Sequence, residues 1–190
     1  MSPAPEHPLL RGERVWLRPL ETADILESSI DDVELGHYSG FRRPFSRAES
    51  ERFAQMLVSQ AETTVNFVIC ELGEERGIGG IALRDIDRLN GSAEVSIFIF
   101  DRSRWGKGFG TDAMLALLDF AFGEMRLERV WLRTFDYNER AVRSYEKAGF
   151  VKEALLRHDR WHRGRYGDTH LMAILRSDWE AQERPRSWER

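Results

Sequence analysis

Hydrophobic and polar residues alternate in several short runs, and a period of two is typical of half-buried strands. Asn66 to Leu72, Ile78 to Ile86 and Ala93 to Phe100 are three such runs, rich in β-branched and aromatic residues. Gly73 and the pair Asn90-Gly91 separate them, and glycine turns of this kind join antiparallel strands. The middle of the chain is therefore predicted to form an antiparallel meander.

Four further runs extend the predicted sheet. Val15 to Leu20 alternates weakly and contains Pro19, whose missing N–H group favours a position at the sheet edge. Three more runs have the same β-rich composition: Arg129 to Phe135, Phe150 to Leu156 and Tyr166 to Leu175. Counting all of these runs gives about seven strands.

Two helices are predicted before the meander. The first begins at Thr22, whose side chain is a good N-cap. The second spans Ser46 to Ala61, where Phe53 and Leu57 recur at helical spacing. Its first serine is followed three residues later by glutamate, which is the pattern of a capping box.

Two more helices are predicted after the meander. From Thr111 onward, apolar residues fall on one helical face, whereas Asp112 and Asp119 share the opposite one. The apolar set is Met114, Leu117, Leu118 and Ala121. Asn138 to Ala148 forms the last helix, capped by Asn138 and ended by Gly149. The order of elements predicts an α/β (α+β) protein with about four helices around the sheet.

Composition narrows the class of protein. The chain has 190 residues with 42% hydrophobic content, which suits one folded domain over residues 1–190, with residues 1–10 and 180–190 as loose termini. It lacks a long apolar span and a signal-peptide pattern, so no membrane partner and a cytoplasmic location are expected. Cys70 is the only cysteine, which excludes an internal disulfide and a cysteine-rich metal site. The net charge of −4 argues against a general nucleic-acid-binding protein.

The most glycine-rich turn of the chain connects a strand to a helix. It runs from Trp105 to Thr111, and Arg102, Arg104 and Lys107 add positive charge there. Alternating glycines let the backbone approach an anion closely, and the N–H groups of the first helical turn favour a phosphate. The turn therefore predicts an anion site, with a glycine-rich connection that binds nothing as the alternative.

Two familiar nucleotide motifs do not explain this turn. A Walker motif ends in glycine, lysine and then serine or threonine. No run of the required length ends in this way in the chain. Gly77, Gly79 and Ala82 formally match a dinucleotide motif, but no helix is predicted after them. We interpret those three residues as part of a strand.

The turn resembles the acetyl-CoA loop of the GCN5-related N-acetyltransferase superfamily, which has the form Gln or Arg, x, x, Gly, x, Gly or Ala. Trp105, Gly108 and Gly110 occupy this pattern, with tryptophan at the first position. A second segment is similar to the family's Asn, x, x, Ala, x, x, x, Tyr, x, x, x, Gly, Phe helix. Its matching residues are Asn138, Ala141, Tyr145, Gly149 and Phe150. Nearly the whole chain is covered, and the branch resembled includes the ribosomal-protein N-terminal (Rim-type) and spermidine acetyltransferases.

The resemblance implies a mixed, mostly antiparallel, splayed sheet that admits the pantetheine arm between two strands. It implies acetyl-CoA as cosubstrate and no metal. The backbone near Phe98 and Ile99 is expected to hold the acetyl carbonyl and the pantetheine. The residues expected to contact the cofactor are Phe98, Ile99, Phe100, Arg104, Trp105, Gly106, Lys107, Gly108, Phe109, Gly110, Thr111, Asn138 and Ser144.

Amine acetylation needs a neutral nucleophile, a site for the oxyanion and a proton for the departing thiolate. Tyr145 is the candidate general acid, with a buried structural aromatic as the alternative. Glu94 resembles the glutamate that some family members place near the acceptor amine; the alternative is an ion pair with an arginine. Asn138 serves as a helix cap, a cofactor ligand or both. His158 and His162 lie outside a predicted helix, so they do not suggest a metal pair.

The acceptor is the least specified part of the prediction. The segment from Glu34 to Phe45 is expected to shape its pocket. An α-amine with a pKa near 8 is about 10% neutral at pH 7, a far larger neutral fraction than that of a lysine side chain. A protein N-terminus, such as that of a ribosomal protein, is therefore the leading expectation for the acceptor. Polyamines, aminoglycosides and amino acids stay open, as does a non-catalytic CoA-binding module. A monomer and a homodimer are both compatible with the sequence.

Overall fold

The structure is a computed structural model that describes residues 10–27, 36–38, 43–59 and 62–190. Within these residues, eight strands form one sheet in the order β1-β2-β3-β4-β5-β6-β8-β7. Their bounds are β1 Leu10–Arg11, β2 Val15–Pro19, β3 Val65–Glu71, β4 Gly77–Asp87, β5 Ser92–Ile99, β6 Arg129–Phe135, β7 Val151–His162 and β8 Arg165–Leu175. The β5–β6 pair is parallel, and every other pair is antiparallel. This confirms the predicted mixed, mostly antiparallel sheet.

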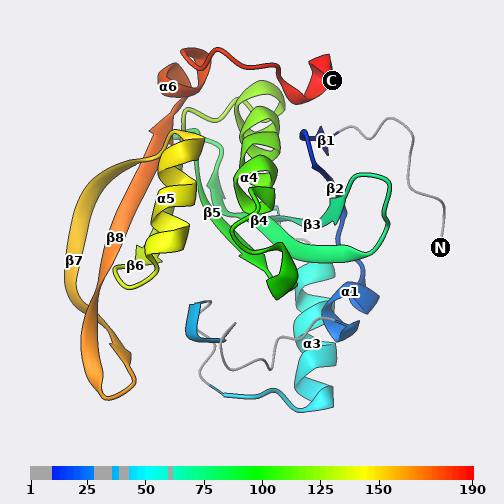
Figure 1. The fold of residues 1–190 in the computed structure, drawn as a ribbon, viewed down its shortest axis with the longest axis vertical. Helices are drawn as coiled ribbons and strands as arrows, with labels where there is room; N and C mark the ends of the chain where they lie inside the picture. The colour runs from blue at the N-terminus through cyan, green and yellow to red at the C-terminus, as the bar shows by residue number, and fades with distance from the viewer. Residues whose placement is uncertain (1–9, 28–35, 39–42, 60–61) are drawn as a thin grey trace.

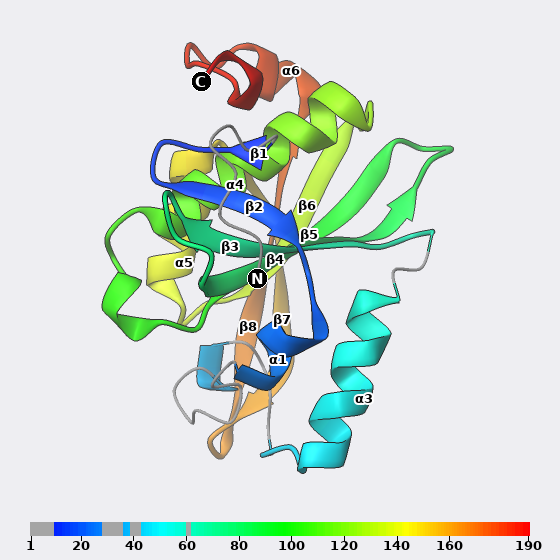
Figure 2. The ribbon, with the colours of Figure 1, turned by 90° about the vertical axis from the view of Figure 1, so that its right-hand side faces the viewer.

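The α-helices with described bounds are α1 Thr22–Glu27, α3 Arg47–Val58, α4 Phe109–Asp119, α5 Glu139–Ala148 and α6 Arg176–Glu180, and residues 36–38 are also helical. Figures 1 and 2 show α4 and α5 over one face of the sheet and α3 with α1 on the other side. A 3-10 turn, η1 (Arg102–Arg104), precedes α4, a π-helical turn, η2 (Phe120–Glu124), continues it, and a second 3-10 turn, η3 (Ser187–Glu189), lies near the C-terminus.

Two hydrophobic cores result from the alternation along the strands. In β2, Val15 and Leu17 point into the larger core beneath α4, whereas Trp16 points into the smaller core beneath α1 and α3. The predicted apolar face of α4 is buried, with Met114 and Leu117 at most 1% exposed. The larger core therefore fixes α4, and with it the glycine-rich turn, against the sheet.

Several predicted boundaries need correction. A short strand, β1, pairs with β2 through Leu10 and Leu17, so the sheet has one strand more than predicted and β2 is not at its edge. Helix α4 begins at Phe109 rather than Thr111. The last two strands are longer than predicted and form a hairpin that extends away from the body (Figure 1). The capping box of Ser46 is confirmed.

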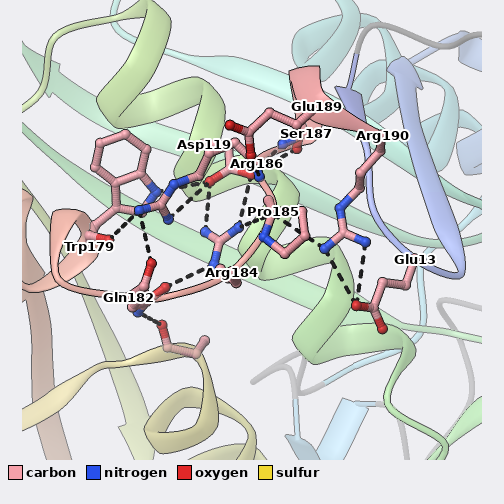
Figure 3. A network of polar contacts seen from close by, with 11 residues as sticks. Glu13, Asp119, Trp179, Gln182, Arg184, Pro185, Arg186, Ser187, Glu189 and Arg190 are labelled. Carbon is pink, nitrogen blue, oxygen red and sulfur yellow. Dashed lines mark hydrogen bonds and ion pairs between the residues drawn. The ribbon is translucent and has the colours of Figure 1, made fainter.

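The prediction of a loose tail is wrong for residues 180–190. Figure 3 shows this segment folded over the end of α4, where it surrounds the carboxylate of Asp119. Asp119 is 1% exposed and accepts hydrogen bonds from the Trp179 indole (2.9 Å), the Arg184 guanidinium (2.7 Å) and the Ser187 backbone N–H (2.8 Å). A buried carboxylate needs such partners, and the charged tail supplies them. The residues of the predicted loose N-terminus lie outside the described part, apart from Leu10.

Candidate active site

The parallel strands β5 and β6 separate part-way along their length. They are paired only from Ser92 with Arg129 to Glu94 with Trp131, although β5 continues to Ile99. On its other edge, β5 stays paired with β4 as far as Ile99. Beyond Glu94, the β6-facing edge of β5 therefore has backbone groups that no neighbouring strand uses.

The alternation of an antiparallel ladder shows which residues present these groups. The Phe100 N–H donates to the Ile78 carbonyl (3.0 Å), so the backbone groups of Phe98, two residues earlier, also face β4. Those of Ile97 and Ile99 face the gap between β5 and β6. The Ile99 carbonyl accepts a hydrogen bond from the Trp105 indole (2.7 Å). The backbone at Phe98 and Ile99 is expected to hold pantetheine, and of these two residues Ile99 faces the gap. Ile97 also faces the gap, which the sequence did not suggest.

The glycine-rich turn lies between the end of β5 and α4. Gly106 (φ +72°) and Gly108 (φ +88°) both have left-handed backbones, which glycine adopts at little cost. A Cβ at either position would meet nothing within 4 Å, so the conformation rather than crowding requires glycine. Gly108 is the N-cap of α4, and the first helical hydrogen bond runs from the Asp112 N–H to its carbonyl (3.0 Å). The N–H groups of residues 109–111 are thus free of helical partners.

Trp105 is held at the start of this turn on several sides. Its indole N–H is bound to the Ile99 carbonyl, the Arg140 guanidinium lies 3.7 Å above its ring centroid, and the Tyr38 ring meets it edge-on at 5.9 Å. Arg140 belongs to α5 and also faces Tyr38 at 5.1 Å. The turn is therefore tied to the end of β5, to α5 and to the segment around Tyr38.

Helix α5 lies beside the N-terminus of α4. The Thr111 and Ser144 hydroxyls are 2.7 Å apart, which joins the two helices next to the glycine-rich turn. Asn138 is buried and its side-chain oxygen accepts from the Ala141 N–H (3.3 Å), so its capping role is confirmed. Tyr145 follows Ser144 and packs against the larger core, with its ring 6.1 Å from that of Phe150.

An aromatic cluster lies next to the start of α5, where Arg140 faces the Tyr38 ring. We define it as His37, Tyr38, Tyr137 and His162, with Trp105 at its end. The Tyr137 hydroxyl donates to the His37 carbonyl (3.0 Å), and Nδ1 of His37 contacts Nε2 of His162. The cluster joins the segment 36–38 to the β7–β8 hairpin and to the glycine-rich turn.

A known domain family covers most of the chain. Residues 14–151 match the model of the acetyltransferase (GNAT) domain, a range that includes β5, the glycine-rich turn and α5. The chain belongs to the GNAT family. It is an N-acetyltransferase with acetyl-CoA as its cosubstrate, as its loop and its α5 motif led us to expect.

Relatives of this acetyltransferase cover most of its length. The spermidine N(1)-acetyltransferase of Vibrio cholerae is 33% identical over 170 residues, 87% of this chain and 95% of its own. The crystal structure of the spermidine N-acetyltransferase of that organism in complex with CoA and spermine superposes with a TM-score of 0.78, at 28% identity, over 87% of this chain and 98% of that one. YdaF of Bacillus subtilis, provisionally named a ribosomal N-acetyltransferase, is 30% identical over 105 residues, 55% of this chain and 57% of its own.

The catalytic candidates of this acetyltransferase differ in their surroundings. Burial raises the pKa of Tyr145 to about 12, and its hydroxyl makes no hydrogen bond to another described residue. It therefore keeps its proton at neutral and mildly alkaline pH. The carboxylate of Glu94 instead accepts hydrogen bonds from Nε (3.0 Å) and Nη2 (3.3 Å) of Arg133, and this ion pair raises the pKa of Arg133. This arrangement is the ion pair with an arginine that the sequence offers as the alternative to a catalytic role for Glu94.

The basic residues expected at the cofactor are engaged to different degrees. The Arg104 guanidinium forms an ion pair with Glu71 (2.6 Å) and lies over the Phe109 ring at 5.5 Å, so it braces the turn. Lys107 is exposed at the tip of the turn. Phe100 and Phe98 have ring centroids 6.3 Å apart at the end of β5. Cofactor contacts by these four residues stay predictions.

Two sequence interpretations of non-catalytic residues are confirmed. Gly77 and Gly79 belong to β4, not to a dinucleotide loop. Cys70 is a buried residue of β3.

His158 and His162 both lie on β7, and no group of three potential metal ligands gathers anywhere in the described residues. In that same part of the chain, no helix has the length and apolar character that crossing a membrane requires.

The sequence missed two features of the site. The aromatic cluster could not be predicted because its members come from four separate segments, and only the fold brings them together. Asp112 was placed on a polar helix face but is only 9% exposed, bound to the turn before β2. Half of the segment from Glu34 to Phe45, expected to shape the acceptor pocket, lies outside the described residues, namely 34–35 and 39–42.

Proposed function

We propose that this enzyme acetylates a primary amine of a small molecule, with polyamines such as spermidine as the leading class. The observation that carries the proposal is the similarity to a spermidine N(1)-acetyltransferase over 87% of the chain. The aromatic cluster is consistent with a cationic acceptor, because aromatic rings attract ammonium groups. The sequence also has Asp31, Asp32 and Glu34 just before His37, and carboxylates suit a polycation.

This proposal replaces the protein N-terminus as the leading acceptor. The larger neutral fraction of an α-amine is a property of the substrate and not of this protein. The relative named for ribosomal acetylation covers only 55% of the chain, whereas the spermidine enzyme covers 87%. A ribosomal-protein partner therefore has less support than a small amine.

The proposed mechanism is direct transfer. A neutral amine attacks the thioester carbonyl, the C–N bond forms and the C–S bond breaks. Backbone N–H groups of Ile97 and Ile99 on the free edge of β5 are the candidates that hold the acetyl carbonyl and pantetheine. Tyr145, which keeps its proton, is the candidate that protonates the departing thiolate. The amine gives its proton to water, directly or through nearby residues, and a proton from water restores the Tyr145 hydroxyl.

Thiol release from acetyl-CoA tests the proposal. We would compare spermidine, spermine, N-terminal peptides, an aminoglycoside and free amino acids as acceptors. We expect polyamines to give the highest kcat/KM. Higher values with N-terminal peptides would reverse the choice of acceptor. Binding of acetyl-CoA without turnover for any amine would favour a non-catalytic CoA-binding module.

The pH profile gives an independent test of the acceptor class. A primary alkylamine titrates near pH 10, so its neutral fraction grows about tenfold per pH unit from pH 7 to 9. An α-amine near pH 8 is already mostly neutral at pH 9. We therefore expect kcat/KM for the true acceptor to keep rising through pH 9, and a plateau above pH 8 would indicate an α-amine.

A further inference from the structure

The turn between β1 and β2 is bound tightly to the helix that begins the cofactor site. The carboxylate of Asp112, in the first turn of α4, accepts from the backbone N–H groups of Glu13 (2.9 Å), Arg14 (2.8 Å) and Val15 (3.0 Å). A Cβ at Gly12 would lie 2.3 Å from this carboxylate, so only glycine permits the approach. The backbone of residues 12–15 is therefore fixed relative to α4.

This fixed backbone places the side chain of Arg14 at the glycine-rich turn. Its Nη1 donates to the carbonyl of Lys107 (3.1 Å), directly before Gly108, the N-cap of α4. The contact is exposed to solvent. The guanidinium has five N–H donors, so most of them stay available beyond this one hydrogen bond.

The charge of Arg14 is also uncompensated. Among the residues the structure describes, no carboxylate forms an ion pair with it, whereas Arg104 on the same turn is paired with Glu71 at 2.6 Å. The nearest acidic neighbour in sequence, Glu13, is paired with Arg190 (3.4 Å). An uncompensated guanidinium beside unpaired helical N–H groups suits a phosphate oxygen.

We propose that Arg14 binds a phosphate group of coenzyme A and so contributes to selection of the acyl donor. The proposal rests on the use of acetyl-CoA by this enzyme and adds a residue that lies more than 90 positions before the glycine-rich turn in the sequence. Coenzyme A has a pyrophosphate and a 3′-phosphate, and both offer the same oxygen chemistry. Arg14 is hydrogen-bonded to Lys107 in this turn, and the experiment below distinguishes the two groups.

The test uses two variants of Arg14 and one matched control. Arg14→Gln removes the charge and shortens the side chain that reaches the Lys107 carbonyl, whereas Arg14→Lys retains the charge. Arg47→Gln, on α3, removes another exposed arginine, one that has no contact with the turn. Each is measured for the Kd of CoA by calorimetry, for KM of acetyl-CoA and of the amine, and for kcat.

We expect Arg14→Gln to raise the Kd of CoA and the KM of acetyl-CoA about tenfold, the effect of one charged hydrogen bond. The KM of the amine and the midpoint of thermal unfolding should stay unchanged, Arg14→Lys should recover most of the affinity, and Arg47→Gln should match the wild type. Wild-type affinity in Arg14→Gln would overturn the proposal. So would an equal loss in Arg14→Lys and Arg14→Gln, because that would indicate a role in holding the Lys107 carbonyl rather than a charge contact.

Dephospho-CoA, which lacks the 3′-phosphate, identifies the group. If Arg14 binds the 3′-phosphate, Arg14→Gln and the wild type bind dephospho-CoA equally well. If it binds the pyrophosphate, the tenfold difference persists. Absence of CoA binding by the wild type would instead reject acetyl-CoA as the donor, an outcome distinct from failure of the Arg14 contact.

Discussion

The hydroxyl of Tyr145 is the single group on which the proposed protonation of the thiolate depends. We expect Tyr145→Phe to lower kcat about ten- to a hundredfold with little change in the KM of acetyl-CoA. Because burial raises the pKa of Tyr145 to about 12, its loss of a proton should not reduce kcat below about pH 10. Steady-state kinetics over pH 7 to 10 checks both statements. An unchanged kcat in the variant would leave Tyr145 as a packing residue.

The ion pair between Glu94 and Arg133 makes a paired experiment informative. If the carboxylate only balances the guanidinium, Glu94→Gln and Arg133→Gln should have the same small effect on thermal stability, and both should keep the wild-type pH profile of kcat/KM. We expect this result, because both oxygens of Glu94 are occupied. A pH profile altered in Glu94→Gln and normal in Arg133→Gln would establish Glu94 as the base.

At the scale of elements, the connection between the β1–β2 turn and α4 depends on Asp112. Asp112→Ala would leave three backbone N–H groups without their acceptor, so we expect a loss of about 3 kcal/mol in the free energy of unfolding. Asp112→Asn keeps one acceptor oxygen and should lose about half as much. Urea denaturation with a two-state fit measures both, and equal values for the two variants would show that the turn does not need this carboxylate.

Elements also mark the boundary of what the sequence could predict. The meander, the capped helix α3 and the helix that ends at Gly149 follow from local periodicity and caps, and all three are present. The burial of Asp112 and Asp119 could not be predicted, because helical periodicity separates polar from apolar faces but does not reveal a partner that is distant in the sequence. The partners of Asp112 lie near the N-terminus and those of Asp119 near the C-terminus. The separation of β5 and β6 was expected from the family resemblance alone, since strand composition does not encode where a parallel pair stops.

Across the whole molecule, the C-terminal tail is part of the folded body rather than an appendage. Arg184→Ala would remove one cation from the buried carboxylate of Asp119, and we expect a loss of about 3 kcal/mol in the free energy of unfolding. Arg190→Ala, which breaks the more exposed pair with Glu13, is the matched control and should cost less than about 1 kcal/mol. Equal losses in the two variants would contradict the central role of Asp119.

The same carboxylate predicts how stability depends on pH. Burial alone would raise the pKa of Asp119, but hydrogen bonds from Arg184 and Trp179 outweigh it and hold the pKa below its usual value near 3.8. A depressed pKa favours the folded state above the unfolded-state pKa and loses this contribution as the pH falls through the folded-state value. Acid unfolding of Arg184→Ala should therefore begin at a higher pH than that of the wild type, as measured by circular dichroism.

The interior position of Cys70 affects how the enzyme can be assayed. Its thiol is 0% exposed and burial raises its pKa to about 11, so the folded protein presents almost no thiolate at pH 8. A chromogenic disulfide reagent added to the reaction should thus report only the coenzyme A that turnover releases. With no other cysteine in the chain, a slow rise in colour without substrates would count unfolded molecules directly, one thiol for each.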